Sequence, residues 1–500
     1  MRKTACLIFL LCVRSSMAQA ETMTITTTLD RLLNETARGR ILTGQRQVAQ
    51  DKFSAQRIGY YLPEISFNTT LPSYRQSQQY ENYYGFAQPI LFKRSDISSY
   101  GNLQLKQKII TGGDLIFQAG YDLRDNEYPT SVMRAVPVEG FPDSVTFERD
   151  IATATDRRRL GNFSLQFSQP LFRSSDSRSA YLDARENLSE ADIQWLASRT
   201  DLKREGITAY FDLLSAGTDL QIAESQSHLA EYTARWDSVK YVDSVITEVT
   251  WVESKSNRLE KKLSLFDAQA TYEEKRNTFN HLLDYPTGSQ ISLDTPEIPA
   301  LPDQQKMQGL LAESDKSTEC ELARIKMDRA ERDLDKTRSS SGLNGTLNAS
   351  YSIGRGNVKQ SQPEFEYTDK INTDDWRVSI DFTYPIWDGG ASGANVHSME
   401  LAYESSRLEY LAAQRNAENK MTILLKRLEI NYSKLSLLAQ ELELADKKLR
   451  DAEKRFGEGM ISDAALLENR TFFFEARKKQ LATLKDYYLD LAELEKIELP

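Results

Sequence analysis

The sequence repeats itself at a constant distance along the chain. Residues 163–172 (FSLQFSQPLF) resemble residues 378–387 (VSIDFTYPIW), at an offset of 215 residues (378 − 163). Residues 240–248 resemble residues 455–463 at the same offset (455 − 240 = 215). Two distant blocks in one register indicate two copies of one unit. Because such a unit usually cannot bury its apolar face alone, the repeat constrains both the fold and the assembly.

Composition excludes some classes of protein. Hydrophobic residues make up 40% of the 500 residues, and the mean hydropathy is −0.54. A polytopic helical membrane protein would need several apolar runs of about 20 residues, which this chain lacks. The formal net charge of −10 argues against nucleic acid as a partner, because nucleic acid binds to basic surfaces.

The N-terminus predicts export. Residues 1–20 combine the basic Arg2 and Lys3, a short apolar stretch and the cleavage pattern Ala18-Gln19-Ala20, which is typical of a signal peptide. The expected mature chain keeps one cysteine, Cys320, and therefore has no internal disulfide.

The first copy, residues 21–285, changes character along its length. Apolar spacing predicts a helix over residues 27–60, and alternation predicts strands over residues 64–172. The segment Thr111-Gly112-Gly113-Asp114 predicts a tight hairpin turn between two strands, which either add to a barrel or fold away from it. Residues 126–158 are charged and contain prolines, and we expect a long loop there.

Long helices follow the strands in both copies. Residues 177–284 contain no proline and predict a helical hairpin, and a proline-rich linker over residues 286–305 ends the first copy. The second copy, residues 306–500, predicts a helix over 306–338, strands over 346–387 and a second hairpin over 391–498. Apolar residues recur in this hairpin at every seventh position: Met421, Leu428, Leu435, Leu442, Leu449 and Phe456. This period indicates that the helix supercoils against other helices.

The strands are too few for a closed barrel from one chain. The second copy supplies two strands and the first about four, whereas a transmembrane barrel needs at least about eight and no open edge. Their alternation of apolar residues with Ser, Gln and Asp fits a wall with lipid outside and water inside. A cluster of aromatic residues would suit the membrane interface: Tyr74, Tyr80, Tyr83, Tyr84 and Phe86. The alternative interpretation of the strands is a soluble β-sandwich with one face in water.

The order of these motifs resembles the TolC-type outer-membrane efflux family over essentially the whole mature chain. The resemblance rests on tandem helix–strand–strand–long-helix units, on Gln169-Pro170-Leu171-Phe172 and Tyr384-Pro385-Ile386-Trp387 before the long helices, and on Arg455-Phe456 with Gly459, Ser462 and Leu466-Leu467 at the helical hairpin. The resemblance implies an α+β fold in a homotrimer. Its chains share an outer-membrane β-barrel that continues into a periplasmic α-helical barrel.

The same resemblance implies a function. Family members are passive exit ducts of tripartite efflux or type I secretion systems, opened by an iris-like movement of the coiled helices at the periplasmic tip. Their partners are a periplasmic adaptor (membrane fusion) protein, an inner-membrane transporter and outer-membrane lipid. We expect the protein to lie in the cell outer membrane of a Gram-negative-type bacterium, with a periplasmic extension. The alternative functions are a non-transporting envelope scaffold and a periplasmic adaptor.

Candidate site residues follow from the hairpin motif. The resemblance implies a turn and an adaptor-docking surface at Arg455, Phe456, Gly459 and Ser462, and in the first copy at Lys240, Tyr241, Ser244 and Thr247. Ser244 replaces the glycine of the motif, which puts the first turn and its docking role in question. A role in shaping the turn alone is the alternative for all of these residues.

Carboxylates form the second group of candidates. Some family members close the tip with carboxylate rings, and the register places Glu468 at such a position, with Glu253 as its counterpart (468 − 253 = 215) and Asp463 nearby. A solvated helix face is the alternative. The sequence predicts no enzyme, no cofactor and no metal site, since His228, His281 and His397 lack the spacing of a zinc motif and no glycine-rich phosphate loop precedes a helix.

Overall fold

The computed structural model describes residues 22–82, 86, 88–172, 176–363 and 365–495. The expected signal peptide, residues 1–20, and the aromatic residues Tyr83 and Tyr84 lie outside this description. The chain forms two compact units. The helical unit comprises Met1–Val48, Glu190–Arg324 and Leu408–Pro500, and the sheet unit comprises Ala49–Ser189 and Ile325–Arg407.

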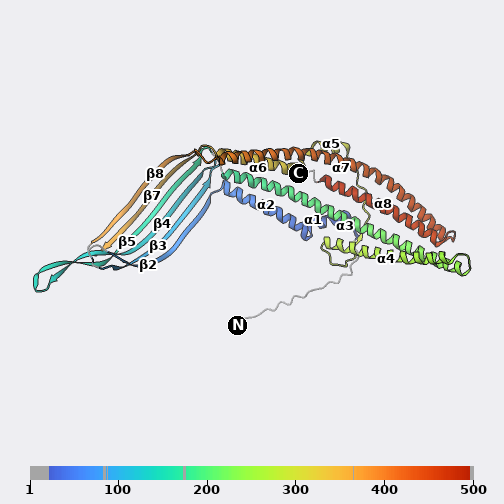
Figure 1. Cartoon of the computed structure of the whole chain (residues 1–500), viewed down its shortest axis with the longest axis horizontal. Coiled ribbons are helices and arrows are strands. Elements are labelled where there is room, and N and C mark those ends of the chain that lie inside the picture. The colour runs from blue at the N-terminus through green and yellow to red at the C-terminus, as the bar shows by residue number, and fades with distance from the viewer. Residues whose placement is uncertain (1–21, 83–85, 87, 173–175, 364, 496–500) are drawn as a thin grey trace, which may run out of the picture. The chain divides into compact units, whose positions relative to one another are not determined.

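The sheet unit contains one antiparallel sheet (Figure 1). Its spatial order is β2-β3-β4-β5-β7-β8, which is also the order of these strands along the chain. Together with the long helices this confirms the α+β class. The strands are β2 (Glu64–Glu81), β3 (Ile90–Lys108), β4 (Asp114–Val138), β5 (Phe141–Pro170), β7 (Asn344–Gln362) and β8 (Phe365–Thr383).

The turn predicted at Thr111–Asp114 joins β3 to β4. The Ile109 amide donates to the Gly113 carbonyl at 2.8 Å, and Gly112 has a φ of 95°, which glycine adopts without a steric cost. Both flanking strands belong to the sheet. The extra hairpin of the first copy therefore adds strands to the sheet.

The prediction of a long loop over residues 126–158 is wrong. β4 and β5 pair through this region, from Glu127 opposite Thr155 to Pro137 opposite Val145. The described pairing of β3 with β4 ends at Glu127, and that of β5 with β7 ends at Thr155. The two strands thus continue as a ribbon with free outer edges. Prolines are tolerated there because a free edge needs no backbone donor.

Helices make up the rest of the described chain. They are α1 (Ile25–Asn34), α2 (Ala37–Tyr61), α3 (Asp176–Val242), α4 (Glu248–Leu282), α5 (Gln304–Ala312), α6 (Thr318–Ser340), α7 (Ala391–Gly457) and α8 (Asp463–Glu495), with a 3-10 turn at Ser314–Lys316. α3 and α7 have 67 residues each, which corresponds to about 100 Å at 1.5 Å per residue. None of the helices in the described ranges is apolar enough over a sufficient length to cross a membrane.

The helix expected over residues 27–60 is interrupted, and so is the one expected over 306–338. α1 ends at Asn34 and α2 begins at Ala37, whose amide donates to the Asp284 carboxylate at 2.7 Å. The acceptor lies 247 residues away in the sequence. A local cap is also present, since the Thr36 hydroxyl accepts from the Gly39 amide at 3.3 Å, and a threonine at this position is a signal for a helix start. The corresponding break in the second copy separates α5 from α6.

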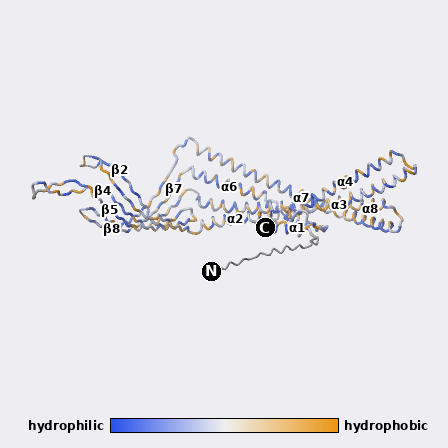
Figure 2. The backbone as a smooth tube through the Cα atoms, turned by 90° about the horizontal axis from the view of Figure 1, so that it is seen from below, coloured by the Kyte–Doolittle hydropathy of each residue, from blue (hydrophilic) through white to orange (hydrophobic). Residues whose placement is uncertain are grey.

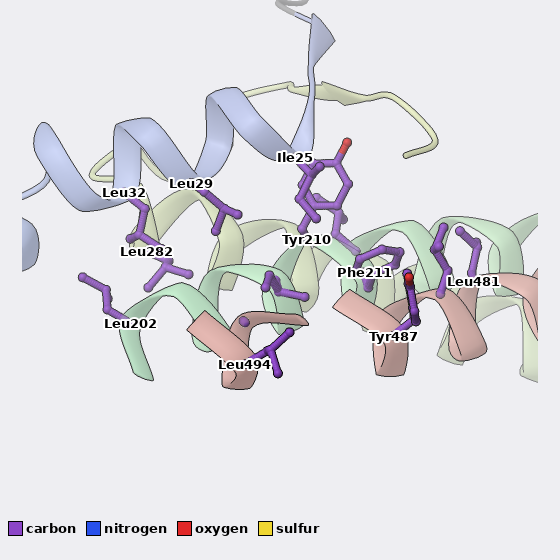
Figure 3. Packing of buried hydrophobic residues seen from close by; sticks show 14 of the residues in the cluster. Ile25, Leu29, Leu32, Leu202, Tyr210, Phe211, Leu282, Leu481, Tyr487 and Leu494 are labelled. Atoms are coloured by element: carbon purple, nitrogen blue, oxygen red, sulfur yellow. The ribbon is translucent and has the colours of Figure 1, made fainter. Parts of the chain in front are cut away.

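The core of the helical unit joins α1, α3, α4, α5, α7 and α8. Figure 3 labels residues of this core on α1, α3, α4 and α8. The heptad residues Met421, Leu428 and Leu435 are fully buried there, as their spacing predicts. Leu442 and Leu449 are half-buried, and Phe456 is 39% exposed near the end of α7. The heptad pattern thus packs most tightly in the middle of α7.

Three tyrosines of this core hold the proline-rich linker. The Tyr210 hydroxyl donates to the Asp294 carbonyl at 2.6 Å, Tyr488 donates to Glu297 at 3.0 Å, and Tyr487 donates to Pro299 at 3.3 Å. Burial raises the pKa of Tyr487 to about 12, so the hydroxyl keeps its proton at physiological pH. In the same region β6 (Ser292–Leu293) pairs in parallel with β1 (Thr22–Met23).

Gly206 allows α1 to approach α3 closely. A Cβ atom at this position would lie 2.5 Å from Cδ2 of Leu32 and 3.0 Å from Cδ2 of Leu29. Leu32 is fully buried. The position therefore admits no larger side chain without a shift of α1.

The two helical hairpins turn in the same way. Val245 and Met460 donate their amides to the carbonyls of Lys240 and Arg455, each at 2.8 Å. Ser244 and Gly459 occupy the same left-handed position, with φ of 57° and 70°. Each turn is therefore a Schellman motif, and Ser244 adopts the conformation despite its side chain.

The close approach at Gly206 predicts opposite effects at two glycines of α3. Gly206→Ala should destabilise the protein by about 1–3 kcal/mol, because the methyl group would overlap Leu32. Gly217→Ala is the matched control and should stabilise by about 0.5–1 kcal/mol, since the new Cβ would lie an ordinary 3.6 Å from Tyr272. Denaturant unfolding of the purified protein measures both, and equal effects would contradict the packing.

The turn geometry predicts a second pair of effects. Ser244→Gly should stabilise the first hairpin by about 1 kcal/mol, and Gly459→Ser should destabilise the second by a similar amount, because a side chain opposes the left-handed conformation. The two melting temperatures should shift in opposite directions. Shifts of the same sign would show that the two turns differ in conformation.

Candidate functional site: a sheet with one apolar face and two helical tips

The register of the sheet gathers apolar side chains on one face. Phe67 lies opposite Leu103, which lies opposite Ala119, and the row continues through Phe163 to Ile353. Phe67 and Phe163 are 67% and 52% exposed in the single chain. The next row runs in the same way across all six strands: Ile65, Leu105, Phe117, Leu165, Tyr351 and Trp376.

The opposite face of the sheet is polar. One of its rows consists of Ser66, Gln104, Gln118, Ser164, Ser352 and Asp375. Hydrogen bonds link the strands there, from Ser168 to Asn348 at 2.8 Å and from Asn348 to Asp381 at 2.7 Å. Figure 2 shows hydrophilic and hydrophobic residues interspersed along the strands. The predicted alternation of apolar with Ser, Gln and Asp side chains is thus present.

Both outer edges of the sheet are open in the described chain. β2 pairs with β3 alone and β8 pairs with β7 alone. Tyr74 and Tyr80 of the aromatic cluster lie within β2, opposite Ile97 and Leu91, and are 63% and 70% exposed. The position of these tyrosines extends the apolar face toward the end of β2.

The tip of the first hairpin carries an aromatic stack. The rings of Tyr241 and Trp251 lie parallel, 4.6 Å apart, and Nζ of Lys255 lies 3.4 Å from the centre of the Trp251 ring. Trp251 also donates to Ser238 at 3.1 Å. Trp251 is absent from the residues predicted above, although a tryptophan next to a turn in a charged helix is itself a signal.

The tips expose large apolar side chains among charged ones. Val242, Val245 and Val249 are 80%, 70% and 66% exposed at the first tip, and Met460 is 70% exposed at the second. The candidate cations at these tips pair with carboxylates one turn back. Arg455 Nε lies 2.9 Å from Asp451, and Lys240 Nζ lies 3.4 Å from Asp237. Such exposed pairs contribute little to stability.

The N-termini of the helices after each turn are capped as the sequence suggests. The Thr247 hydroxyl accepts from the Thr250 amide at 3.3 Å, and the Ser462 hydroxyl accepts from the Ala465 amide at 3.4 Å. Asp463 is exposed in the first turn of α8, where the helix dipole favours an anion.

The two candidate gate carboxylates have different surroundings. Glu468 is exposed on α8 and lines a groove of about 500 Å³ with side chains of α3 and α4, among them Lys261. Glu253 is exposed on α4 and is not among the residues that line this groove. Within one chain the structure therefore does not bring Glu468 and Glu253 together.

A buried carboxylate in the helical unit was not predicted from the sequence. Asp490 is 3% exposed, accepts from Asn431 at 2.9 Å and pairs with Arg427. Burial raises the pKa of Asp490, and the Arg427 and Asn431 contacts oppose this shift. Asn431 stands seven residues after Leu424, at an apolar heptad position, and a polar residue there could have revealed the site.

We find no arrangement for a metal ion among the residues that the structure describes. No group of three or more His, Cys, Asp and Glu side chains lies close enough to hold one.

Known proteins share parts of this sequence and the fold. Residues 321–497 match the outer membrane efflux protein family. The outer membrane protein TolC of Vibrio cholerae is 23% identical over 340 residues, which cover 66% of this chain and 74% of that protein.

Two solved structures of outer-membrane proteins have the same fold. VceC of Vibrio cholerae aligns with a TM-score of 0.55 at 14% identity, over 95% of each chain. The CmeC outer-membrane channel of Campylobacter jejuni aligns with a TM-score of 0.54 at 12% identity, over 95% of this chain and 85% of that one.

The comparisons confirm the predicted resemblance and, at the level of the family, the expected location in the cell outer membrane with a periplasmic extension. They also agree with the structure on the tandem helix–strand–strand–helix fold. Over residues 321–497 the chain thus matches the outer membrane efflux protein family, it resembles TolC over a longer stretch, and it has the fold of solved outer-membrane channels.

Proposed function

We propose that this protein is the outer-membrane exit duct of a tripartite efflux or type I secretion system. The observation that carries the proposal is the six-stranded sheet, with its exposed apolar face, its polar face and its two open edges. A sheet of this kind is stable in a membrane only when neighbours pair its edges and lipid covers its apolar face.

Three copies would satisfy both needs as a homotrimer. Their sheets would share one barrel in outer-membrane lipid, and the helices that leave each sheet would form a tunnel through the periplasm. The length of about 100 Å available to a 67-residue helix supports a role across a wide compartment. The duct conducts passively, and the energy comes from an inner-membrane transporter.

The helical tips are the proposed contact with a periplasmic adaptor. The motif residues Arg455, Phe456, Gly459 and Ser462 shape the second tip, and Lys240, Tyr241, Ser244 and Thr247 shape the first. The two turns share their backbone conformation, which supports docking at both tips. The exposed valines supply apolar area for a partner.

Opening of the tip is the proposed gate. Paired supercoiled helices have more than one packing arrangement, and one of them would close the tunnel at its periplasmic end. Glu468, its counterpart Glu253 in the first copy and Asp463 would place carboxylates around the axis of a trimer, where they repel one another and attract cations.

Conductance in planar bilayers tests the proposed function directly. The purified protein should have the mass of a trimer in detergent and should form channels of reproducible conductance. A trimer that forms no channels under any condition would instead indicate an envelope scaffold. A soluble monomer would indicate an adaptor.

The docking surface predicts a specific loss of binding. Val245→Glu together with Val249→Glu should weaken crosslinking to the adaptor about tenfold, because charges replace apolar contact at the tip. Ile423→Glu is the control, since Ile423 is 64% exposed on α7 but far from the tip in sequence. Unchanged crosslinking in the valine variant would place the adaptor contact elsewhere.

The gate predicts a change in single-channel conductance. Glu468→Ala should loosen the closed tip and raise the conductance, and the pairing with Glu253→Ala should raise it further. Lys261→Ala is the control for the groove that Glu468 lines. Unchanged conductance in both glutamate variants would count against a carboxylate ring, and an equal rise with Lys261→Ala would assign the effect to the groove.

A further inference from the structure

The strand region of the first copy is much longer than that of the second. β2 and β7 begin 280 residues apart (344 − 64), whereas the copies are 215 residues apart beyond the strands. The first copy therefore carries about 65 more residues between these points. They form two additional strands, because the first copy supplies β2 to β5 and the second supplies β7 and β8.

The additional strands belong to the same wall as the others. β3 and β4 pair continuously with each other and with β2 and β5. Their outward side chains are apolar and exposed, with Leu103 at 44%, Phe117 at 39% and Tyr121 at 50%. Leu103 lies in the row of Phe67 and Phe163, and Phe117 and Tyr121 lie in the two adjacent rows of the same face. A hairpin held in water beside the barrel would have no need of an apolar face.

The edges of the sheet are suited to pairing with other copies of the chain. β2 runs away from α2, and β8 runs toward α7, so β2 of one copy and β8 of the next would be antiparallel. Both edge strands are apolar on the face that the whole sheet shares. Ile65 and Phe67 on β2 are 65% and 67% exposed, and Trp376 and Val378 on β8 are 78% and 59% exposed.

We infer that three copies close a barrel of eighteen strands (3 × 6) whose lumen is wide enough for a polypeptide. The inference rests on the proposed trimeric duct. With strands about 4.8 Å apart and tilted by about 40°, eighteen strands enclose a backbone diameter of about 35 Å. Without the additional hairpin, three chains would supply twelve strands (3 × 4) and enclose about 24 Å. After side chains, about 25 Å remains, which exceeds the 10–12 Å of an α-helix.

Part of the inward face carries short side chains. One row reads Asn68, Asn102, Gly120, Asn162, Gly354 and Thr373. The side chain of Asn162 lies over Gly120, with Oδ1 2.5 Å from the place of a Cβ atom, and Thr373 lies over Gly354 in the same way. These side chains lie along the wall. Selection by size would therefore fall to the helical tip, and the barrel would pass cargo up to polypeptides.

Disulfide crosslinking and electron microscopy of the full-length protein test this inference. In a Cys320→Ala background, Phe67→Cys with Leu103→Cys should form a disulfide within one chain, because the two residues are directly opposite. Phe67→Cys combined in turn with Trp376→Cys, Val378→Cys and Ile380→Cys should give a disulfide between chains in at least one combination. Images of the detergent-solubilised trimer should show a barrel about 35 Å across.

The outcomes separate this inference from the proposed function. A trimer with a ring of about 24 Å, or one in which the Phe67–Leu103 pair does not crosslink, would overturn the eighteen-stranded barrel and leave the duct standing. A protein that forms no trimeric ring would overturn both. A ring of the larger diameter with both kinds of crosslink would support both.

Discussion

The structure depends on a sheet that cannot remain uncovered. Each large apolar side chain left in water forgoes about 1.5–3 kcal/mol of burial, and the outward rows contain many of them, from Phe67 on β2 to Trp376 on β8. The unpaired backbone groups at β2 and β8 add a second cost in a bilayer, where no water satisfies them. In the proposed duct, lipid would cover the first surface and neighbouring copies would pair the second. The same strands would then account for both membrane insertion and oligomerisation.

The helical unit solves a different problem, since it has to hold long helices together in water. Its core is built from heptad residues such as Leu428 and Leu435, and the hydroxyls of Tyr210, Tyr487 and Tyr488 fix the linker between the two copies. This anchoring explains how a proline-rich segment without regular structure of its own keeps a defined path. The tips beyond the core expose valines and a methionine and have little internal packing, which suits surfaces that bind a partner or move.

Much of this architecture follows from the sequence because it rests on periodic patterns. The 215-residue offset locates the equivalent turns at Ser244 and Gly459, and alternation identifies the two faces of the sheet. The failures have physical causes. The Ala37 amide at the start of α2 donates to Asp284, 247 residues away, and the ribbon beyond Glu127 tolerates Pro129 and Pro137 because its outer edges are free. Asp490 was missed because its partners Arg427 and Asn431 come from another helix, and the polar Asn431 at an apolar heptad position was the one local signal.

The most direct test of the account asks which face of the sheet meets lipid. Leu165 and Gln166 are neighbours on β5 and belong to opposite faces. With Cys320→Ala as background, Gln166→Cys should react with a hydrophilic, membrane-impermeant thiol reagent in proteoliposomes. A fluorophore attached at Leu165→Cys should be quenched by spin-labelled lipid. Equal reaction at both positions without quenching by lipid would contradict a membrane wall and indicate a soluble sheet.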